Sequence, residues 1–412
     1  MSGKRFLFLQ GPISPFFPRL ADALEQRGHK AFRINLNLGD RLFWRRPGAV
    51  DYRGRLADWP AFLEDFLDRN AITDIAFLGE QRAYHKAALA AAKPRGIRVV
   101  ATDFGYLRPD WITFERDGMN GASQFTKDPD EIRRIARAAP PADWSRRYQD
   151  RFFNQASWDI AYHLAQIFWP FAFPHYRSHQ LHSPILIYLG TGRRILMRRF
   201  ANAEAARLMD RYRAQGTRYF FMPLQMETDF QLRAYSPFPD LSTPIRMITR
   251  SFAANAPPDT RLLFKNHPLD PGLRNWRRRV MRIAEEAGVG DRVDYLDGGD
   301  LDTMILGALG SVMVNSTVGL RALYLKKPVL ILGDAVYRVP GMVSGQALDD
   351  FWRGPQAPDP GLVEDFIAAL AATIQIRGVY YNQPGIDAAV AAAAERLDLG
   401  CINAMLPVSE AA

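Results

Sequence analysis

Residues 5–14 read Arg-Phe-Leu-Phe-Leu-Gln-Gly-Pro-Ile-Ser, a short apolar run that ends in turn-forming residues. A helical pattern follows from Phe17 to Arg27, and the next apolar run, Lys30 to Leu36, predicts a second strand. The alternation continues to a strand at Arg98–Thr102. Strands joined by helices of this length form a parallel sheet with right-handed crossovers. Residues 1–126 therefore predict an N-terminal Rossmann-like α/β domain.

The same alternation returns after Arg218. Strands are predicted at Tyr219–Pro223, Arg261–Lys265, Ser311–Val314 and Pro328–Leu332, with helical patterns between them. Residues 201–360 therefore predict a second Rossmann-like domain, for nucleotide-sugar binding. Two such domains facing a cleft form an architecture similar to that of the GT-B glycosyltransferases, an analogy at the level of fold.

Two further segments have a different pattern. Residues 127–200 are rich in aromatics and mostly helical, which predicts a linking segment whose one strand is Pro184–Leu189, followed by a turn at Gly190–Gly192. Residues 361–412 predict C-terminal helices that pack back on the N-terminal domain.

The composition is that of a globular protein. Hydrophobic residues make up 48% and charged residues 24% of the 412, and a single cysteine excludes an internal disulfide. No apolar run approaches the roughly 20 residues that span a bilayer, so we expect a soluble, cytoplasmic protein. The 53 basic against 44 acidic residues leave a formal charge of +9. This excess suits an anionic partner, or it reflects solvated faces of an arginine-rich protein.

The most distinctive block begins at Asp103 and continues through Arg108 and Trp111 to Glu115 and Asn120. It follows a buried strand, so we expect it in a loop at the carboxyl edge of the sheet, where α/β proteins bind ligands. Carboxylates together with aromatic faces suit a sugar site. The alternative is a salt-bridged turn with the tryptophan in the core.

Two blocks of the second domain point to an anion site. Lys265-Asn266-His267-Pro268 follows a strand, and its imidazole could donate to a phosphate. Asn315-Ser316-Thr317-Val318-Gly319 opens a helix, whose N–H groups and hydroxyls could bind the same anion, although a plain helix cap explains this block as well.

Three histidines of the linking segment, His175, His179 and His182, are spaced so that one helical face could hold all three. A metal triad and a polar cluster on the acceptor side are both open interpretations. The prolines and the arginine around them favour the polar cluster.

These blocks occur together in a known group of proteins. The chain resembles the capsule polysaccharide biosynthesis proteins of the KpsS type, which are related to the Kdo transferase modules of KpsC. The resemblance is carried by Phe8–Pro12, Gly105–Asn120, Pro223–Gln231, Lys265–Pro268 and Asn315–Gly333, in order over most of the chain.

The resemblance implies a retaining β-Kdo glycosyltransferase that uses CMP-Kdo as donor, without a further cofactor or a metal. It implies that an acidic residue acts at the anomeric carbon, for which Asp103 and Glu115 are the two candidates, and that His267 stabilises the departing CMP phosphate with Ser316 and Thr317. The other residues expected in the donor pocket are Lys265, Asn315 and Gly319; those expected to contact substrate are Gly11, Arg108, Trp111, Asn120 and Gln225.

The implied acceptor is phosphatidylglycerol, an anionic lipid that anchors certain capsules. The loop from Leu42 to Arg55 combines aromatic and cationic residues, which suits an anionic interface, although a plain exposed loop has the same composition. We therefore expect a peripheral protein at the inner face of the inner membrane, with other capsule assembly proteins as further partners.

Two other functions remain open. A GT-B enzyme with another donor, such as CMP-sialic acid or a UDP-sugar, would have the same pocket residues. A non-catalytic capsule export or assembly factor would keep the fold without turnover. Nucleic-acid binding is disfavoured because the sequence has no continuous basic stripe.

Overall fold

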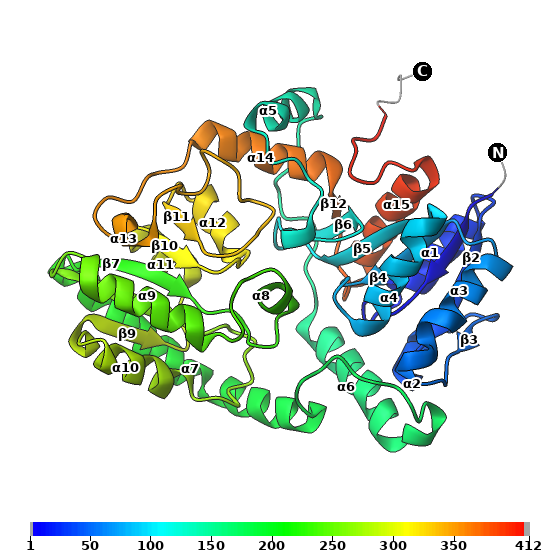
Figure 1. Ribbon diagram of the computed structural model, residues 1–412, viewed down its shortest axis with the longest axis horizontal. Helices are drawn as coiled ribbons and strands as arrows, with labels where there is room; N and C mark the ends of the chain where they lie inside the picture. The colour runs from blue at the N-terminus through cyan, green and yellow to red at the C-terminus, as the bar shows by residue number, and fades with distance from the viewer. Residues whose placement is uncertain (1–2, 408–412) are drawn as a thin grey trace. The chain divides into compact units, whose positions relative to one another are not determined.

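The computed structural model describes residues 3–407, and the chain divides into two compact units (Figure 1). The first unit comprises residues 3–125, 134–179 and 367–407, and the second comprises residues 126–133 and 180–366. The segment expected as a link, 127–200, is thus shared between the units rather than separate from them. Helices α5 (Pro129–Ala138) and α14 (Pro360–Thr373) each contain a division point.

The first unit is built on a seven-stranded sheet with the order β12-β6-β5-β4-β1-β2-β3. Its strands are β1 (Arg5–Phe8), β2 (Lys30–Asn35), β3 (Val50–Asp51), β4 (Asp74–Leu78), β5 (Arg98–Phe104), β6 (Trp111–Arg116) and β12 (Gln375–Arg377). Its helices are α1 (Phe16–Glu25), α2 (Leu38–Phe43), α3 (Trp59–Arg69), α4 (Ala83–Ala92), α6 (Phe152–Phe168) and α15 (Gln383–Leu399). The strands β1 to β5 are parallel, in the order 3-2-1-4-5 of a Rossmann fold.

Both faces of this sheet are buried, because successive side chains of a strand point to opposite faces. Phe6 and Phe8 of β1 pack with α1 and the C-terminal helix α15, whereas Leu7 packs with α3 and α4 on the other face. Figure 1 shows α15 in the first unit, where it packs with α1. Helix α15 thus completes the core to which β1 contributes.

The second unit holds a five-stranded parallel sheet with the order β11-β10-β7-β8-β9. Its strands are β7 (Arg218–Pro223), β8 (Thr260–Lys265), β9 (Val293–Leu296), β10 (Ser311–Met313) and β11 (Val329–Ile331). Its helices are α7 (Pro184–Gln215), α8 (Phe230–Ala234), α9 (Ser242–Asn255), α10 (Trp276–Glu286), α11 (Leu301–Gly307), α12 (Val318–Tyr324) and α13 (Leu348–Phe351). Counted along the chain, its strands have the same 3-2-1-4-5 order, so the prediction of two Rossmann-like domains is confirmed.

The strand predicted at Pro184–Leu189 is wrong, because these residues form the first turns of the 32-residue helix α7. A short apolar run fits a strand and a buried helix equally well, and proline is tolerated at a helix start. Gly190–Gly192 is also helical rather than a turn. A Cβ at Gly190 would lie 2.2 Å from the carbonyl oxygen of Pro271, so glycine lets α7 approach that loop closely.

The sequence reading missed two strands at one edge of the first sheet. β6 pairs antiparallel with β5 and places Glu115 opposite Ala101, so Glu115 lies in a strand and not in a loop. β12 in turn pairs antiparallel with β6, within a stretch expected to be helical. β6 follows β5 after residues 105–110, whose turn-forming residues gave this block the pattern of a loop. β12 is short and is defined by its pairing with a strand that is remote in sequence.

The loop expected at a membrane, Leu42–Arg55, is a part of the first unit's core. Trp44 and Tyr52 are only 4% and 7% exposed. The ring of Tyr52 lies 4.9 Å from that of Trp59, and Arg46 pairs with Asp22 at 3.1 Å. Trp44 and Tyr52 are therefore unavailable to a bilayer. Phe43 is half-buried beside Trp158 and Tyr162.

Candidate functional site

The second unit has a switch point between β7 and β10, where the strand order reverses. Ligands of doubly wound sheets bind in the crevice outside the carboxyl ends of the strands at such a point. Two predicted site residues lie there, since Gln225 follows β7 and Asn315 follows β10.

Gln225 and Asn315 bond to each other across this switch point. Gln225 Nε2 donates to Asn315 Oδ1 at 2.9 Å, and the Asn315 backbone N–H donates to Gln225 Oε1 at 3.3 Å. Asn315 Nδ2 also donates to the carbonyl oxygens of Gln231 and Tyr235. Both side chains are at least 95% buried. The pair therefore holds the two loops in register and fixes the backbone that faces a ligand.

His267 lies at the end of the adjacent strand β8. Its backbone N–H donates to Asn266 Oδ1 at 2.9 Å, and its Nδ1 accepts from the N–H of Leu269 at 3.1 Å. With Nδ1 an acceptor, the neutral imidazole carries its proton on Nε2. Asn266 is itself held by Asp297, to which its Nδ2 donates at 3.0 Å. The imidazole is thus oriented as a hydrogen-bond donor.

Lys265 is 7% exposed, and burial together with the nearby Arg194 guanidinium lowers its pKa. Its Nζ lies 3.4 Å from the carbonyl oxygen of Asn266. This buried cation adds positive potential beneath the strand end that carries the histidine.

The block after β10 forms the entrance to α12. Ser316 Oγ accepts from the N–H of Val318 at 3.2 Å, while Thr317 is exposed. Gly319 is required by packing, because a Cβ there would lie 2.3 Å from the hydroxyl of Tyr337. β7 separates β8 from β10, so His267 and the Ser316 block are not on neighbouring strands. The two strand axes are about 10 Å apart.

Asp103 and Glu115 lie on adjacent strands of the first unit, in different surroundings. Asp103 is partly exposed at the end of β5, where Phe104 N–H donates to its Oδ1 at 2.7 Å. Burial raises the pKa of Asp103, and the Arg108 and Arg82 guanidinium groups oppose this. The Arg108 guanidinium lies 5.2 Å from the ring centre of Phe104.

Glu115 is 0% exposed and serves a local network. It accepts from the hydroxyl of Tyr106 at 2.6 Å and from that of Ser123. The same Tyr106 hydroxyl accepts from the backbone N–H of Asn120, a residue with a φ of 50°. Burial raises the pKa of Glu115 to about 8. Glu115 and Asn120 therefore hold the turn after β6 in place.

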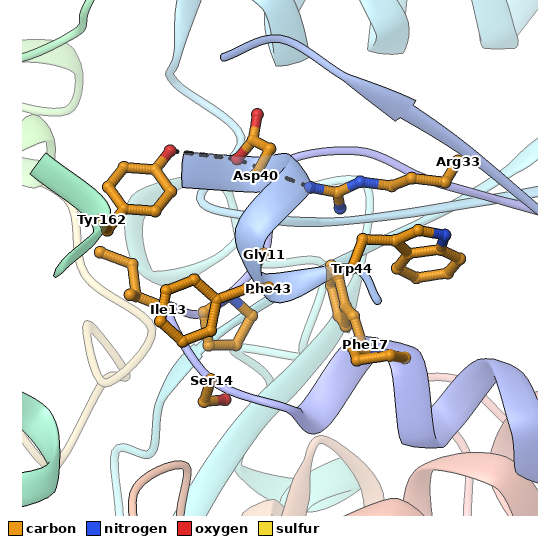
Figure 2. A pocket seen from close by; sticks show the side chains of 11 residues that line it. Gly11, Ile13, Ser14, Phe17, Arg33, Asp40, Phe43, Trp44 and Tyr162 are labelled. Carbon is orange, nitrogen blue, oxygen red and sulfur yellow. Dashed lines mark hydrogen bonds and ion pairs between the residues drawn. The ribbon is translucent and has the colours of Figure 1, made fainter. Parts of the chain in front are cut away.

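The two remaining residues predicted to contact substrate, Trp111 and Gly11, pack against other side chains of the first unit. The guanidinium of Arg377 lies 4.5 Å from the ring centre of Trp111, and Trp144 lies 6.0 Å away on another side. Gly11 lies against Phe17, where a Cβ would be only 2.3 Å from the ring. The pocket beside Gly11 encloses about 10 Å³ (Figure 2), room for one water molecule.

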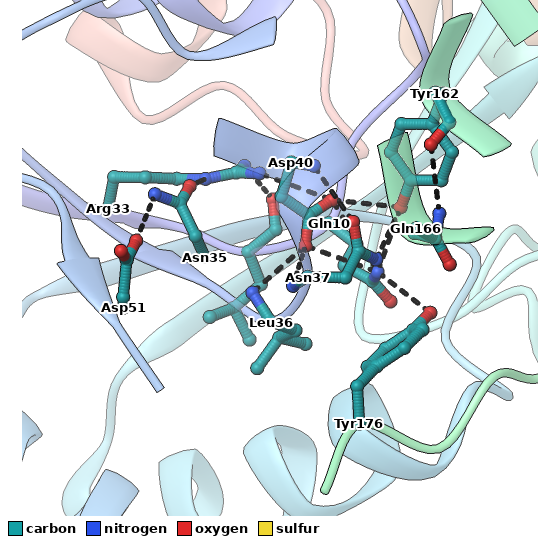
Figure 3. Close-up of polar contacts among 11 residues, drawn as sticks. Gln10, Arg33, Asn35, Leu36, Asn37, Asp40, Asp51, Tyr162, Gln166 and Tyr176 are labelled. Atoms are coloured by element: carbon teal, nitrogen blue, oxygen red, sulfur yellow. Dashed lines mark hydrogen bonds and ion pairs between the residues drawn. The ribbon is translucent and has the colours of Figure 1, made fainter. Parts of the chain in front are cut away.

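A buried polar network at the carboxyl ends of β1 and β2 in the first unit (Figure 3) was not predicted from the sequence. Asp40 accepts from Gln10 Nε2 at 3.2 Å and from the Tyr162 hydroxyl at 3.0 Å. The same tyrosine accepts from Asn37 Nδ2 at 2.7 Å, while Asp40 and Asn37 form a capping box on α2. The sequence pattern Asn-x-x-Asp is typical of a capping box and could have predicted it. No sequence pattern predicts the contact with Tyr162, which is remote in sequence.

The histidines of residues 173–183 lie in a stretch without α-helix, so the helical face proposed for them does not form. Burial and the nearby Arg82 charge lower the pKa of His179, with smaller contributions from His85 and His163. Within residues 3–407, no three His, Cys, Asp or Glu side chains are grouped as a metal site would need. None of the helices in that range has the length and apolar character to cross a bilayer.

Comparison with known proteins gives consistent matches. Residues 73–381 match the model of the capsule polysaccharide biosynthesis protein family. The capsule polysaccharide export protein KpsS of Escherichia coli is 31% identical over 92% of this chain and 98% of its own length. The capsule polysaccharide modification protein LipB of Neisseria meningitidis serogroup B is 30% identical over 93% of each chain.

Among solved structures, the β-Kdo 2,7 transferase of KpsC from Thermosulfurimonas dismutans is similar over 96% of this chain and 99% of that one. Its sequence identity is 12% and its TM-score 0.45.

Proposed function

The chain belongs to the capsule polysaccharide biosynthesis protein family, and on that premise we propose that it is a glycosyltransferase that acts in capsule assembly. The observation that carries this proposal is the switch point of the second unit. There a buried amide pair fixes two loops, and an imidazole oriented as a donor stands at the next strand end. Such an arrangement suits the phosphate of a nucleotide.

We propose CMP-Kdo as the donor and phosphatidylglycerol as the acceptor. A solved structure with which the chain shares its α/β architecture is named a Kdo transferase, and the resemblance of the motif blocks supports the same donor. The excess of 53 basic over 44 acidic residues suits a donor with a carboxylate and a phosphate, and an anionic lipid. The protein would then work at the inner face of the inner membrane, together with other capsule assembly proteins.

We propose that the configuration is retained by two displacements. In the first, a carboxylate oxygen bonds to the anomeric carbon while the bond from that carbon to the phosphate oxygen breaks, and CMP leaves with the electron pair. In the second, an acceptor hydroxyl oxygen bonds to the anomeric carbon while the bond to the carboxylate breaks, the carboxylate leaves with the electron pair, and the hydroxyl proton passes to solvent. We assign that carboxylate to Asp103, since it is partly exposed whereas Glu115 is sealed by Tyr106 and Ser123.

His267 is assigned to the phosphate of the departing CMP. Its Nε2 proton can stabilise the negative charge that develops as the bond breaks, and buried Lys265 adds to the positive potential. Ser316 and Thr317 are the further donors of this site, and the Gln225–Asn315 pair positions the backbone around it.

The test is a transfer assay with purified protein, CMP-Kdo generated in place and a short-chain phosphatidylglycerol, read by mass spectrometry. The proposal expects a Kdo-lipid product that is lost in His267→Ala. CMP binding without product would indicate another acceptor or sugar, so CMP-sialic acid and UDP-sugars form further arms of the assay.

A second candidate function is a non-catalytic role in capsule export, which the name of the Escherichia coli relative favours. It expects no product with any donor and no CMP binding. That pair of results would replace the transferase proposal.

A further inference from the structure

Helix α7 turns an apolar stripe toward solvent. Its members, Ile185, Leu189, Leu196 and Phe200, are 52, 67, 76 and 53% exposed. At 100° per residue these positions lie within about 60° of one another around the helix axis. The stripe is about 22 Å long at 1.5 Å per residue. Its length and regular spacing set it apart from singly exposed apolar residues, which are common on protein surfaces.

The opposite side of α7 fixes this orientation. Arg194 Nη2 donates to the carbonyl oxygen of Asp297 at 3.3 Å, and its guanidinium lies 3.6 Å from Asp270. Gly190, on the same side, lies against the carbonyl of Pro271. α7 is therefore held against the second unit by one side, and the stripe points away from it.

The charge around the stripe has one sign. Arg193 and Arg199 flank it, each within about 40° of its edges. The Arg199 guanidinium lies 4.6 Å from the ring centre of Phe200. Residues 160–203 contain five arginines and neither aspartate nor glutamate. An apolar face with arginines along its edges is typical of helices that lie in the interface of an anionic membrane.

We infer that this face of α7 binds the surface of an anionic bilayer, with Leu189 and Leu196 among the acyl chains and Arg193 and Arg199 at the lipid phosphates. The surface differs from the Leu42–Arg55 loop, in which Trp44 and Tyr52 are buried. This inference rests on the proposed function in one respect, namely that the acceptor is a lipid. Vesicle binding needs no sugar donor, so failure of either proposal can be recognised separately.

The test is co-sedimentation of the full chain with vesicles of 70% phosphatidylcholine and 30% phosphatidylglycerol. We expect binding that falls about tenfold or more in Leu189→Glu/Leu196→Glu, because two apolar groups leave the acyl region and two negative charges face the lipid. Arg193→Gln/Arg199→Gln should bind about tenfold more weakly and lose the dependence on salt. The matched control is Leu306→Glu, which changes a 51% exposed leucine on α11 of the same unit and should bind as the wild type does.

Equal binding of the wild type and the double glutamate variant would overturn the inference, as would equal binding to pure phosphatidylcholine vesicles. A wild type that is dimeric in solution, with a monomeric Leu189→Glu/Leu196→Glu variant, would assign the stripe to contact between copies instead. The arginine variant leaves the apolar stripe intact and keeps the test valid if the glutamate variant fails to fold.

Discussion

The two units begin in the same way and then diverge. In each, a Leu-Gln pair follows the first strand of a 3-2-1-4-5 sheet: Leu9-Gln10 after β1 and Leu224-Gln225 after β7. Gln10 donates to Asp40 of α2, which follows the second strand. Gln225 donates to Asn315, which follows the fourth strand and so lies across the switch point. One glutamine anchors a covering helix, and the other joins the two loops that a ligand would face.

The difference shows why a shared fold does not imply a shared function. In the first unit, helices α2 and α6 bring Asp40 and Tyr162 over the strand ends, and these side chains satisfy one another. In the second unit the corresponding amide pair is tied to backbone groups of α8 and its C-cap, and His267 stands beside it. We therefore propose that the second unit binds the nucleotide, whereas the network of the first unit has a structural role.

The largest expected effect separates the two carboxylates of the first unit. Asp103→Asn should lower turnover at least about 10³-fold, because removal of a nucleophile abolishes the first displacement. Glu115→Gln should leave turnover within about threefold of the wild type, since its amide can still bond to Tyr106 and Ser123. The transfer assay measures both variants. The opposite pattern would move the catalytic role to Glu115.

His267→Ala should lower turnover about 10²-fold, the usual cost of removing one donor to a developing charge. His29→Ala is the control, because His29 bonds to Asp398 in the first unit. Comparable losses in the two variants would show that the effect of His267→Ala is not specific to the phosphate site.

Substitutions of Gln225 and Asn315 should have non-additive effects on stability and CMP binding. Gln225→Ala removes two hydrogen bonds of the buried Asn315, so we expect a loss of about 1–3 kcal/mol in the free energy of unfolding and weaker CMP binding. Denaturant unfolding and calorimetric titration of Gln225→Ala, Asn315→Ala and the double variant form a mutant cycle. Additive effects would contradict the coupling.

The strand ends around the second unit's candidate site were predicted from the sequence, whereas β6 and β12 of the first unit were not. The strand ends at Pro223, Lys265 and Val314 follow from local apolar runs, and a parallel sheet brings such ends to one edge. The amide pair itself was not foreseen, because Gln225 and Asn315 are 90 residues apart and neither position has a local signal of pairing.

In the first unit the errors have physical causes. Glu115 was expected in an open loop, but β6 returns antiparallel to β5 after residues 105–110, and β12 is defined only by its pairing with β6, which is remote in sequence. The segment around Trp44 and Tyr52 has the composition of a surface loop. These two rings are buried only because residues from other elements pack on them. In the second unit, the apolar run Ile185–Leu189 fits a strand or a helix by periodicity, so only the length of α7 decides.

The pH dependence of stability should report on Glu115. Its folded pKa, about 8, lies above the usual value of 4.5, so the folded state holds the proton more tightly than the unfolded state. The associated stabilisation is full below about pH 4.5 and is lost as the pH rises through 8. Glu115→Gln has no proton to lose, so its melting temperature should exceed that of the wild type by a few degrees at pH 8.5 and change less with pH. A melting temperature that changes by the same amount with pH in both proteins would contradict this.

The smallest expected effect belongs to the network of the first unit. Tyr162→Phe removes the hydroxyl that Asp40 and Asn37 share, and should cost about 1–2 kcal/mol in the free energy of unfolding. CMP affinity should not change, because the network anchors α6 and lies outside the proposed nucleotide site. A tenfold loss of CMP binding in this variant would break the division of roles between the units.

The most direct test of that division is calorimetric titration of CMP into the wild type, Asn315→Ala and Tyr162→Phe. We predict saturable binding of one CMP per chain by the wild type and by Tyr162→Phe, with affinity at least tenfold lower in Asn315→Ala. Equal affinity in all three proteins, or a loss confined to Tyr162→Phe, would contradict the assignment of nucleotide binding to the second unit.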